Sequence, residues 1–184
     1  GAMPMISAAS MRASLYPRIE PLLEKLPANL MSKSGSGKGH VGRYVRIELP
    51  GKFRTLTLAE VEVFSDGSNV ARAGKASQSS TAHGGAAQRG IDGNKSGSFG
   101  DGGQTHTAEG TTNPWWEVDL GREFPIESIV LYNRADGNLG SRLSGYTLKI
   151  LDASRKEVHV LTKQATPMVK TDHVFQSADP VVVI

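Results

Sequence analysis

Apolar and polar residues alternate along several short stretches of the chain. In RYVRIEL, residues 43–49, the apolar Val45, Ile47 and Leu49 are separated by longer polar or aromatic side chains. The stretch LTLAEVEVF, residues 56–64, repeats this alternation after a Pro-Gly turn. A period of two is typical of a β-strand with one buried face. We therefore predict two strands here, paired as a hairpin or as neighbours.

Further strand-like stretches follow, separated by turn residues. The cluster at 66–69 predicts a turn, and the small, polar stretch 69–81 predicts an edge strand with a loop. The other predicted strands lie in WWEVDLG (115–121), PIESIVLYNR (125–134), LSGYTLKILDASRKEVHVL (143–161) and VVVI (181–184), with breaks at Gly121, Pro125 and 152–154. About eight short strands in this arrangement are typical of an antiparallel β-sandwich jelly roll, so we expect an all-β fold.

The N-terminal region carries the only helical signals of the sequence. Apolar residues recur at helical spacing between Ile19 and Leu26, while three prolines restrict any helix to short pieces. The following SKSGSGKG, residues 32–39, has the composition of a flexible linker. We therefore predict that residues 1–39 are a tag remnant, a short helical extension and a linker, and that residues 40–184 form one domain.

Composition narrows the possible functions. A chain of 184 residues buries one substantial core, and its 21 glycines and 9 prolines favour short strands and turns over long helices. The absence of cysteine excludes disulfides, zinc–thiolate sites and cysteine nucleophiles. The net charge of +3 is dispersed along the sequence, which argues against nucleic-acid binding. The sequence shows no membrane-spanning run, no signal peptide and none of the common catalytic motifs, so we expect a non-enzymatic protein.

Several motifs together resemble one family. NVARAGKASQSST, GIDGN, THT, NPWWEVDLG, IVLYNR and SRLSGYTLKILD, within residues 69–152, occur in the order and spacing of the fucolectin group of discoidin-like domains. Members of that group are calcium-binding, fucose-specific lectins with a jelly-roll fold, related to coagulation-factor C domains. The resemblance implies the same fold here, and an extracellular, periplasmic or cell-surface location.

The order of two strands differs from the family pattern. The family's last two strands usually read like RYVRI followed by LCEVEVY, whereas here RYVRIEL and LTLAEVEVF stand first. The first and last strands of such a fold are neighbours and its termini lie close together, so moving them changes little in the topology. We therefore interpret the domain as a circular permutant, with residues 181–184 or the segment before them filling the new C-terminal end.

The resemblance also implies a calcium site. The expected ligands are the main-chain carbonyls of Arg89, Asn94 and Gly103, the carboxylate of Asp92, and the carboxylate and carbonyl of Glu60. Calcium takes several oxygen ligands, and glycines allow a loop to curl around the ion. The family often has Ser at Gly103, so a hydroxyl ligand is missing here. The alternative is a simple turn at Asp92 and an exposed strand residue at Glu60.

The sugar-binding residues implied by the resemblance are His106, Arg134 and Arg142. Arginine supplies several donors in a fixed fork, and histidine supplies a donor or an acceptor, which suits the hydroxyl and ring oxygens of a monosaccharide. Asp136 follows Arg134 at the family's spacing and is expected to orient it through a charge-assisted hydrogen bond. The alternatives are a loop histidine bonded to the backbone and surface ion pairs of the two arginines.

The loop after Arg134 departs from the family pattern. It is one residue longer, and Gly137-Asn138 replaces the cysteine pair that forms an apolar platform under the fucose methyl group. Phe99 and Leu139 are the candidates to supply that platform instead. The resemblance therefore implies sugar binding, whereas the altered loop argues against a strict preference for fucose.

The tryptophans and the remaining histidines are not assigned to a binding site. One of Trp115 and Trp116 is expected in the core and the other beneath the loops. The remaining histidines, which show no metal-ligand spacing along the sequence, are His40, His83, His159 and His173.

The residues together predict a calcium-dependent carbohydrate-binding module for fucose or a related sugar, forming part of a larger protein. The alternative is a docking or spacer module that keeps the calcium site but has lost sugar binding. Related domains bind membranes through apolar loop tips, and only Phe99 and Leu139 are available for this here, which argues against a membrane partner.

Overall fold

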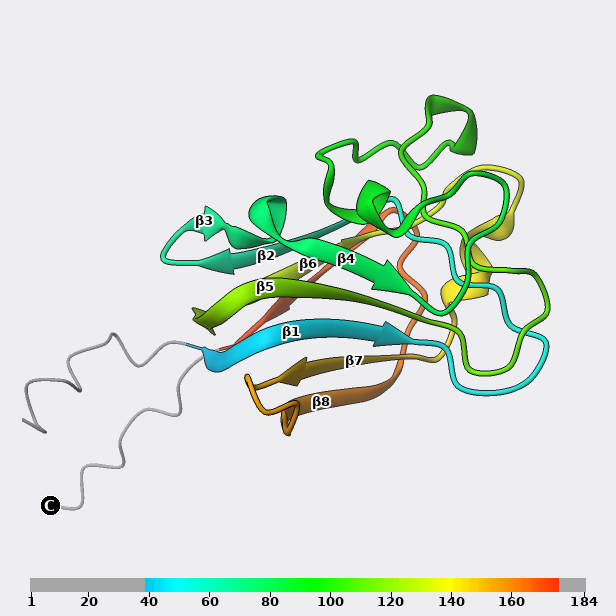
Figure 1. Ribbon diagram of the computed structural model, residues 1–184. Coiled ribbons are helices and arrows are strands. Elements are labelled where there is room, and N and C mark those ends of the chain that lie inside the picture. The colour runs from blue at the N-terminus through cyan, green and yellow to red at the C-terminus, as the bar shows by residue number, and fades with distance from the viewer. Residues whose placement is uncertain (1–38, 176–184) are drawn as a thin grey trace, which may run out of the picture. The chain divides into compact units, whose positions relative to one another are not determined.

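The computed structural model of the protein describes residues 39–175, which form two packed antiparallel sheets (Figure 1). The five-stranded sheet has the order β4-β5-β1-β7-β8 and the four-stranded sheet the order β3-β2-β6-β9. The strands are β1 His40–Glu48, β2 Glu60–Ser65, β3 Ser68–Asn69, β4 Lys75–Gln78, β5 Trp115–Ile126, β6 Ser128–Tyr132, β7 Tyr146–Leu151, β8 Glu157–Gln164 and β9 Lys170–Val174. The helical elements of this part of the chain are 3-10 turns, η1 Val70–Ala73, η2 Ala87–Ile91, η3 Phe99–Asp101 and η4 Leu139–Leu143. The predicted all-β sandwich is confirmed.

The core lies between the sheets and follows the alternation of the sequence. Val45 and Ile47 of β1 and Val61 of β2 are fully buried, as the period of two predicts. Trp116 is fully buried too, and its Nε1 donates to the carbonyl of Ala87 at 2.9 Å. Its neighbour Trp115 faces the other way, under the guanidinium group of Arg46, 4.1 Å from the ring centroid. One tryptophan is thus in the core, but the expectation that the other packs beneath the loops was wrong.

The first two predicted strands are not neighbours. β1 pairs with β5 and β7, whereas β2 pairs with β3 and β6 in the other sheet. The segment between them crosses from sheet to sheet, and its Leu56 and Leu58 are fully buried. Alternation therefore continues through the crossover, which is why the sequence pattern began the second strand too early and suggested a hairpin.

β5 continues through both of its predicted breaks. Gly121 adopts φ +85° within a bulge, and the register of β1 and β5 shifts between Gly42 and Tyr44. Pro125 pairs with Val41, beyond the section of β5 that pairs with β4. Because proline lacks an N–H group, it fits a strand only where no neighbouring strand needs that hydrogen bond. Gly121 and Pro125 therefore interrupt the pairing with a neighbouring strand, but β5 itself continues through both.

The described chain begins and ends at the same side of the sandwich, opposite the long loops (Figure 1). The ring of His40 lies 5.3 Å from that of Phe175, and Phe175 N donates to the carbonyl of Glu127 at 2.8 Å. A permuted chain requires such neighbouring ends, and permutation stays a prediction. The predicted helical extension, most of the linker and the VVVI strand lie outside the described residues, and the division at residue 40 also stays a prediction. Within residues 39–175, no helix has the length and apolar character needed to cross a bilayer.

Candidate functional site

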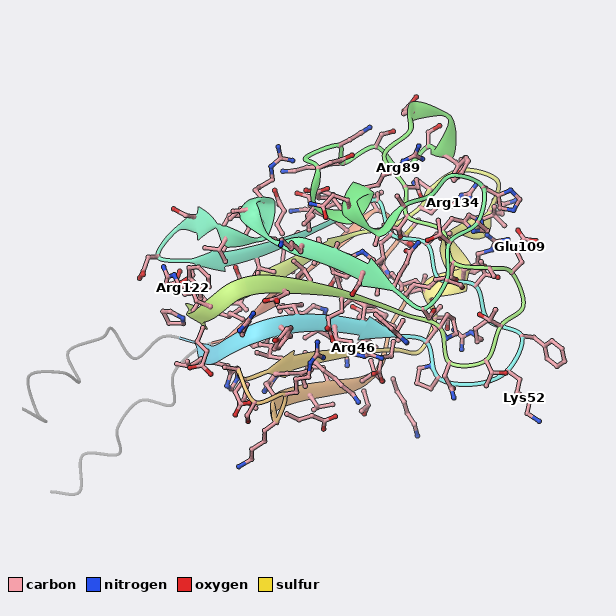
Figure 2. The ribbon with its side chains drawn as sticks, viewed as in Figure 1. Arg46, Lys52, Arg89, Glu109, Arg122 and Arg134 are labelled. Carbon is pink, nitrogen blue, oxygen red and sulfur yellow. The ribbon has the colours of Figure 1, made fainter. Side chains whose placement is uncertain are left out.

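The loops at one end of the sandwich hold both groups of predicted site residues. Figure 2 shows Arg89, Arg134 and Glu109 at this end, whereas Arg122 lies at the other. The segment 105–107 reaches this end by pairing with the crossover segment. Thr105 N donates to the carbonyl of Leu58 at 2.9 Å, and Thr107 N to that of Leu56 at 3.0 Å. This pairing fixes the backbone on both sides of His106.

Glu60 begins β2 and is fully buried. Its Oε1 accepts a hydrogen bond from Gly93 N at 3.0 Å, while its buried Oε2 has no hydrogen-bond partner among the described residues. Burial raises the pKa of Glu60 to about 7; the Gly93 hydrogen bond opposes this, and the nearby charge of Asp92 adds to it. The alternative of an exposed strand residue at Glu60 is therefore wrong. A buried carboxylate with a free oxygen needs a positive charge or a proton beside it.

The loop facing Glu60 contains the other predicted metal ligands. Arg89 lies in η2, and Asp92 is its C-terminal cap. Asp92 Oδ1 accepts from Asn94 N at 2.8 Å, and a Cβ atom built on Gly103 would lie 2.9 Å from the carbonyl oxygen of Asn94. Residues 92–94 and Gly103 are thus held in close backbone contact, which only glycine permits at that position.

An arginine that the sequence pattern did not single out also lies here. Arg72 Nη1 donates to the carbonyl of Ile91 at 3.2 Å, and it lies 2.4 Å from where a Cβ of Gly93 would be. Its charge lowers the pKa of Glu60, but less than burial raises it. Glu60 thus presents an orphaned carboxylate oxygen to a curled, glycine-containing loop. This oxygen-only donor set fits a hard cation such as calcium.

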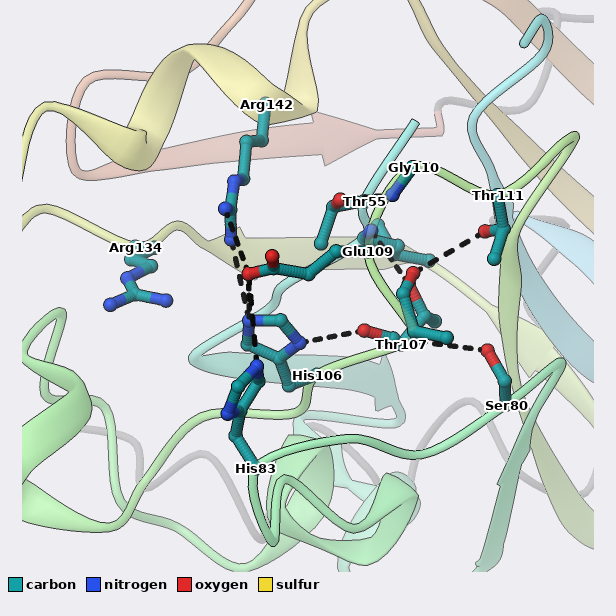
Figure 3. Close-up of polar contacts among 12 residues, drawn as sticks. Thr55, Ser80, His83, His106, Thr107, Glu109, Gly110, Thr111, Arg134 and Arg142 are labelled. Atoms are coloured by element: carbon teal, nitrogen blue, oxygen red, sulfur yellow. Dashed lines mark hydrogen bonds and ion pairs between the residues drawn. The ribbon is translucent and has the colours of Figure 1, made fainter. Parts of the chain in front are cut away.

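Five of the six predicted sugar-binding residues line one cavity of about 240 Å³. Figure 3 shows its polar contacts. The cavity is lined by His83, Phe99, His106, Glu109, Arg134, Leu139 and Arg142. The sixth predicted residue, Asp136, is hydrogen-bonded to Arg134 and does not itself line the cavity. The loop end of the sandwich thus brings the predicted set together.

His106 is buried and held in one tautomer. Its Nδ1 lies 2.6 Å from the carbonyl of Thr107, an acceptor, so Nδ1 carries the proton and Nε2 presents a lone pair. Burial lowers the pKa of His106; the bond to Thr107 opposes this, and the charge of Arg142 lowers it further. His106 is therefore a neutral acceptor in the cavity at neutral pH. The alternative interpretation, a loop histidine bonded to the backbone, holds for Nδ1 and not for Nε2, which faces the cavity.

Arg134 is buried and oriented by an acid, as predicted. Its Nε donates to Asp136 Oδ1 at 2.5 Å, and Asp136 Oδ2 accepts from Phe99 N at 3.0 Å. The bond from Arg134 lowers the pKa of Asp136, which is therefore ionised. The guanidinium carbon of Arg134 lies 4.9 Å from the Phe99 ring centroid, and the edge of that ring meets His106 with centroids 5.8 Å apart. The carboxylate of Asp136 therefore fixes both the donor Arg134 and the apolar wall that Phe99 forms in the cavity.

Arg142 projects from η4 toward His106. Its Nη1 lies 3.3 Å from His106 Nε2, and its Nη2 donates to Glu109 Oε1 at 3.4 Å. The side chain of Asn133 holds the loop before it by donating to the carbonyl of Gly140 at 3.0 Å. Arg142 thus meets both an acceptor nitrogen and a carboxylate in the cavity.

Sequence reasoning missed His83 and Glu109. Glu109 Oε1 lies 3.7 Å from His83 Nε2 and 3.9 Å from His106 Nε2. Glu109 follows His106 by three residues in the same loop, which was an available signal. His83 stands far from both in the sequence, so linear spacing could not reveal that these three side chains form a cluster.

The chain is similar to proteins of one known family. Residues 89–180 match the family described as NedA-like, galactose-binding domain, of F5/8 type C. The chain is 37% identical over 116 residues to the Fucolectin of Anguilla anguilla, covering 57% of this chain and 72% of that protein. The lectin domain of Lectinolysin complexed with Lewis B antigen is 38% identical with a TM-score of 0.57, covering 60% of this chain and 79% of that one.

A fucose binding module of Streptococcus pneumoniae is 33% identical with a TM-score of 0.56, covering 62% of this chain and 81% of that one. These relatives are lectins and binding modules, and the expectation of a non-enzymatic protein is confirmed. The chain belongs to the NedA-like, galactose-binding family of F5/8 type C domains, and its relatives include fucolectins.

Proposed function

We propose that the protein is a calcium-dependent lectin module that binds fucose, or a related sugar, in a glycan. The observation that carries this proposal is the convergence of His106, Arg134 and Arg142 on a cavity of about 240 Å³. Fixed donors, one neutral acceptor and an apolar wall are what a monosaccharide requires. The fucolectin and fucose binding module relatives support the same class of ligand.

Each side chain has a distinct role in this proposal. His106 Nε2 accepts a hydrogen bond from a sugar hydroxyl, since its other nitrogen is bonded to Thr107. Arg134 and Arg142 donate to hydroxyl or ring oxygens. Phe99 and Leu139 cover the apolar C–H face, in place of the cysteine pair that the family pattern has at 137–138. Without that platform, the site tolerates sugars related to fucose.

Calcium is the proposed partner of the loop 89–103. Glu60, Asp92 and the carbonyls of Arg89, Asn94 and Gly103 would hold it, supported by the free, buried Oε2 of Glu60. When bound, the ion supplies the positive charge that this buried carboxylate lacks. Because Phe99 lies between Asn94 and Gly103 in the chain, a fixed loop also fixes the apolar wall of the sugar cavity.

We further propose that the chain is circularly permuted and acts outside the cytoplasm, in the extracellular space, in the periplasm or at the cell surface. The neighbouring positions of His40 and Phe175 support the circular permutation. The fucolectin relatives support the location outside the cytoplasm. The wider protein to which the module belongs would supply any further activity.

The second candidate function is a docking or spacer module without sugar binding. One observation favours it: Glu109 Oε1 already accepts from Arg142 Nη2 at 3.4 Å, so a sugar must compete with this contact.

A glycan array with and without chelator separates these functions. The lectin proposal expects binding of fucose-containing glycans with calcium and loss of binding with chelator. The matched control is Arg122→Lys, because Arg122 is an exposed arginine at the other end of the sandwich. No binding to any glycan by the folded, calcium-loaded protein would favour the docking module.

A further inference from the structure

Three side chains in the sugar cavity carry donor atoms of the kind that bind transition metals. The nearest available atoms of His83, His106 and Glu109 all lie within 4.8 Å of one another. Glu109 Oε1 is 3.7 Å from His83 Nε2 and 3.9 Å from His106 Nε2 (Figure 3). Ligands of a tetrahedral zinc ion lie about 3.4 Å apart, given zinc–ligand distances of about 2.0 to 2.1 Å. The cluster is therefore only slightly wider than a bound ion requires.

His106 is already arranged as a metal ligand. Its Nδ1–H donates to the carbonyl of Thr107 at 2.6 Å, which leaves the Nε2 lone pair facing the cluster. A backbone carbonyl on the far nitrogen is one of the usual partners of a metal-binding histidine, because it fixes the tautomer and the orientation of the ring. The side chain is only 3% exposed, so it is the rigid member of the set.

The other two members can close on an ion. The side chains of His83 and Glu109 are 57% and 58% exposed, and both lie on loops. A movement of about 1 Å by each would bring their donor atoms to zinc-binding separation. One buried, fixed ligand and two exposed, adjustable ligands leave a fourth position open to solvent.

Arg142 occupies the position that the ion would take. Its Nη1 lies 3.3 Å from His106 Nε2 and its Nη2 3.4 Å from Glu109 Oε1. A guanidinium group thus contacts the same nitrogen and the same carboxylate that an ion would take. Metal binding requires Arg142 to withdraw, and its positive charge opposes the metal while it stays.

We propose that His83, His106 and Glu109 bind a zinc ion that displaces Arg142 and excludes the sugar. Two imidazole nitrogens and one carboxylate suit zinc, whereas calcium prefers oxygen ligands, so this site is separate from the one at Glu60. Exclusion follows because zinc takes His106 Nε2 and displaces Arg142, both of which the proposed sugar contacts need. Only this exclusion rests on the proposed lectin function.

The test is calorimetric titration of the whole chain with zinc chloride, in buffer containing calcium and no chelator. We expect one zinc ion per chain, with binding about tenfold weaker or worse in His83→Ala and in Glu109→Gln. Arg142→Ala is expected to bind zinc roughly severalfold more tightly, because it removes an opposing charge. The control His159→Ala removes a histidine from the other histidine cluster and should bind zinc as the unchanged protein does.

Each outcome decides the proposal. Zinc binding that is absent, or equal in the unchanged protein, His83→Ala and Glu109→Gln, overturns the site. Loss of binding in His159→Ala would assign the ion to the other cluster and overturn it as well. A second titration with fucose, with and without saturating zinc, tests exclusion: unchanged fucose affinity would refute it. A protein that binds zinc but never binds fucose would sink the lectin proposal and leave the zinc site standing.

Discussion

Arg134 and Asp136 form an ion pair that points one face of a buried guanidinium group into the sugar cavity. Nε of Arg134 donates to Oδ1 at 2.5 Å, and Oδ2 accepts from the backbone of Phe99 at 3.0 Å. Asp136 itself does not line the cavity. Its effect on a ligand is therefore indirect, through the position of the arginine and of the aromatic ring.

Asp136→Ala should weaken fucose binding while the domain stays folded. A hydrogen bond to a charged group contributes about 1.5 to 3 kcal/mol, so a loss of roughly tenfold or more is expected. Calorimetry with fucose measures the affinity, and circular dichroism checks the fold. Asp66→Ala, in an exposed turn, is the matched control and should bind as before. Equal affinity in Asp136→Ala would show that Arg134 needs no orienting partner.

Arg134→Lys should not restore the sugar affinity that Arg134→Ala loses. Lysine keeps the charge, but its single ammonium group cannot bond Asp136 through Nε and also present a planar donor to the sugar. Both variants are expected to lose about 1.5 to 3 kcal/mol of binding free energy. Titration of the two variants beside the control Arg122→Lys, at the other end of the sandwich, checks this. Near-normal binding by Arg134→Lys would show that charge alone suffices.

Chelation should lower the melting temperature, and Glu60→Gln should remove that sensitivity. At a calcium concentration about 100 times the Kd, a site on the folded state contributes about 2.7 kcal/mol of stability. The neutral amide removes the charge that the ion offsets, so calcium should no longer raise the melting temperature. The control Glu123→Gln, an exposed carboxylate, should keep the calcium response. Identical melting curves with and without chelator in the unchanged protein would sink the calcium site.

The sequence predicted strands well where burial is one-sided. RYVRIEL alternates because one face of β1 contacts the opposite sheet and the other faces solvent. The same alternation at Leu56 and Leu58 marks a crossover, whose backbone bonds to Thr105 and Thr107 instead of joining a sheet. Periodicity reports which side chains are buried, and it does not report which backbone partner they have.

The site residues that belong to sequence motifs were predicted, and those outside the motifs were not. His106, Arg134, Arg142, Phe99 and Leu139 come together in the cavity, as the resemblance implied. His83 and Glu109 belong to no motif, and they enter the cavity because the loops of residues 82–85 and 108–110 meet there. Such a meeting depends on the fold of two loops at once, so neither loop's own sequence could show it.

The protein should lose stability as the pH falls below about 6.5, the ordinary pKa of histidine. Burial lowers the pKa of His159 and of His173. The charge of His40 lowers the pKa of His159 further. The charge of Asp172 raises the pKa of His173 and so opposes the effect of burial there. Since these two histidines bind fewer protons in the folded state than in the unfolded one, the stability that they contribute is present above pH 6.5 and is lost as acid protonates them.

Urea unfolding between pH 7.5 and pH 5.5 measures this loss, with calcium in the buffer. The double variant His159→Gln, His173→Gln should show a smaller decrease in unfolding free energy than the unchanged protein. A residual decrease is expected from His106, whose pKa burial also lowers. An equal decrease in both proteins would show that these two histidines do not couple to folding.

Glu109→Gln should make the cavity more tolerant of acidic sugars. Glu109 Oε1 accepts from Arg142 Nη2 at 3.4 Å, so it neutralises part of the arginine's charge and repels a ligand carboxylate. Galactose and galacturonic acid differ by one carboxylate, and their competition against fucose measures the preference. Because the Glu109 side chain is 58% exposed, the ratio of their affinities should shift toward the acid by at most about fivefold. Salt should reduce that shift, since exposed charges are screened. The control Glu157→Gln, outside the cavity, should leave the ratio unchanged, and an unchanged ratio in Glu109→Gln as well would show that Glu109 does not select by charge.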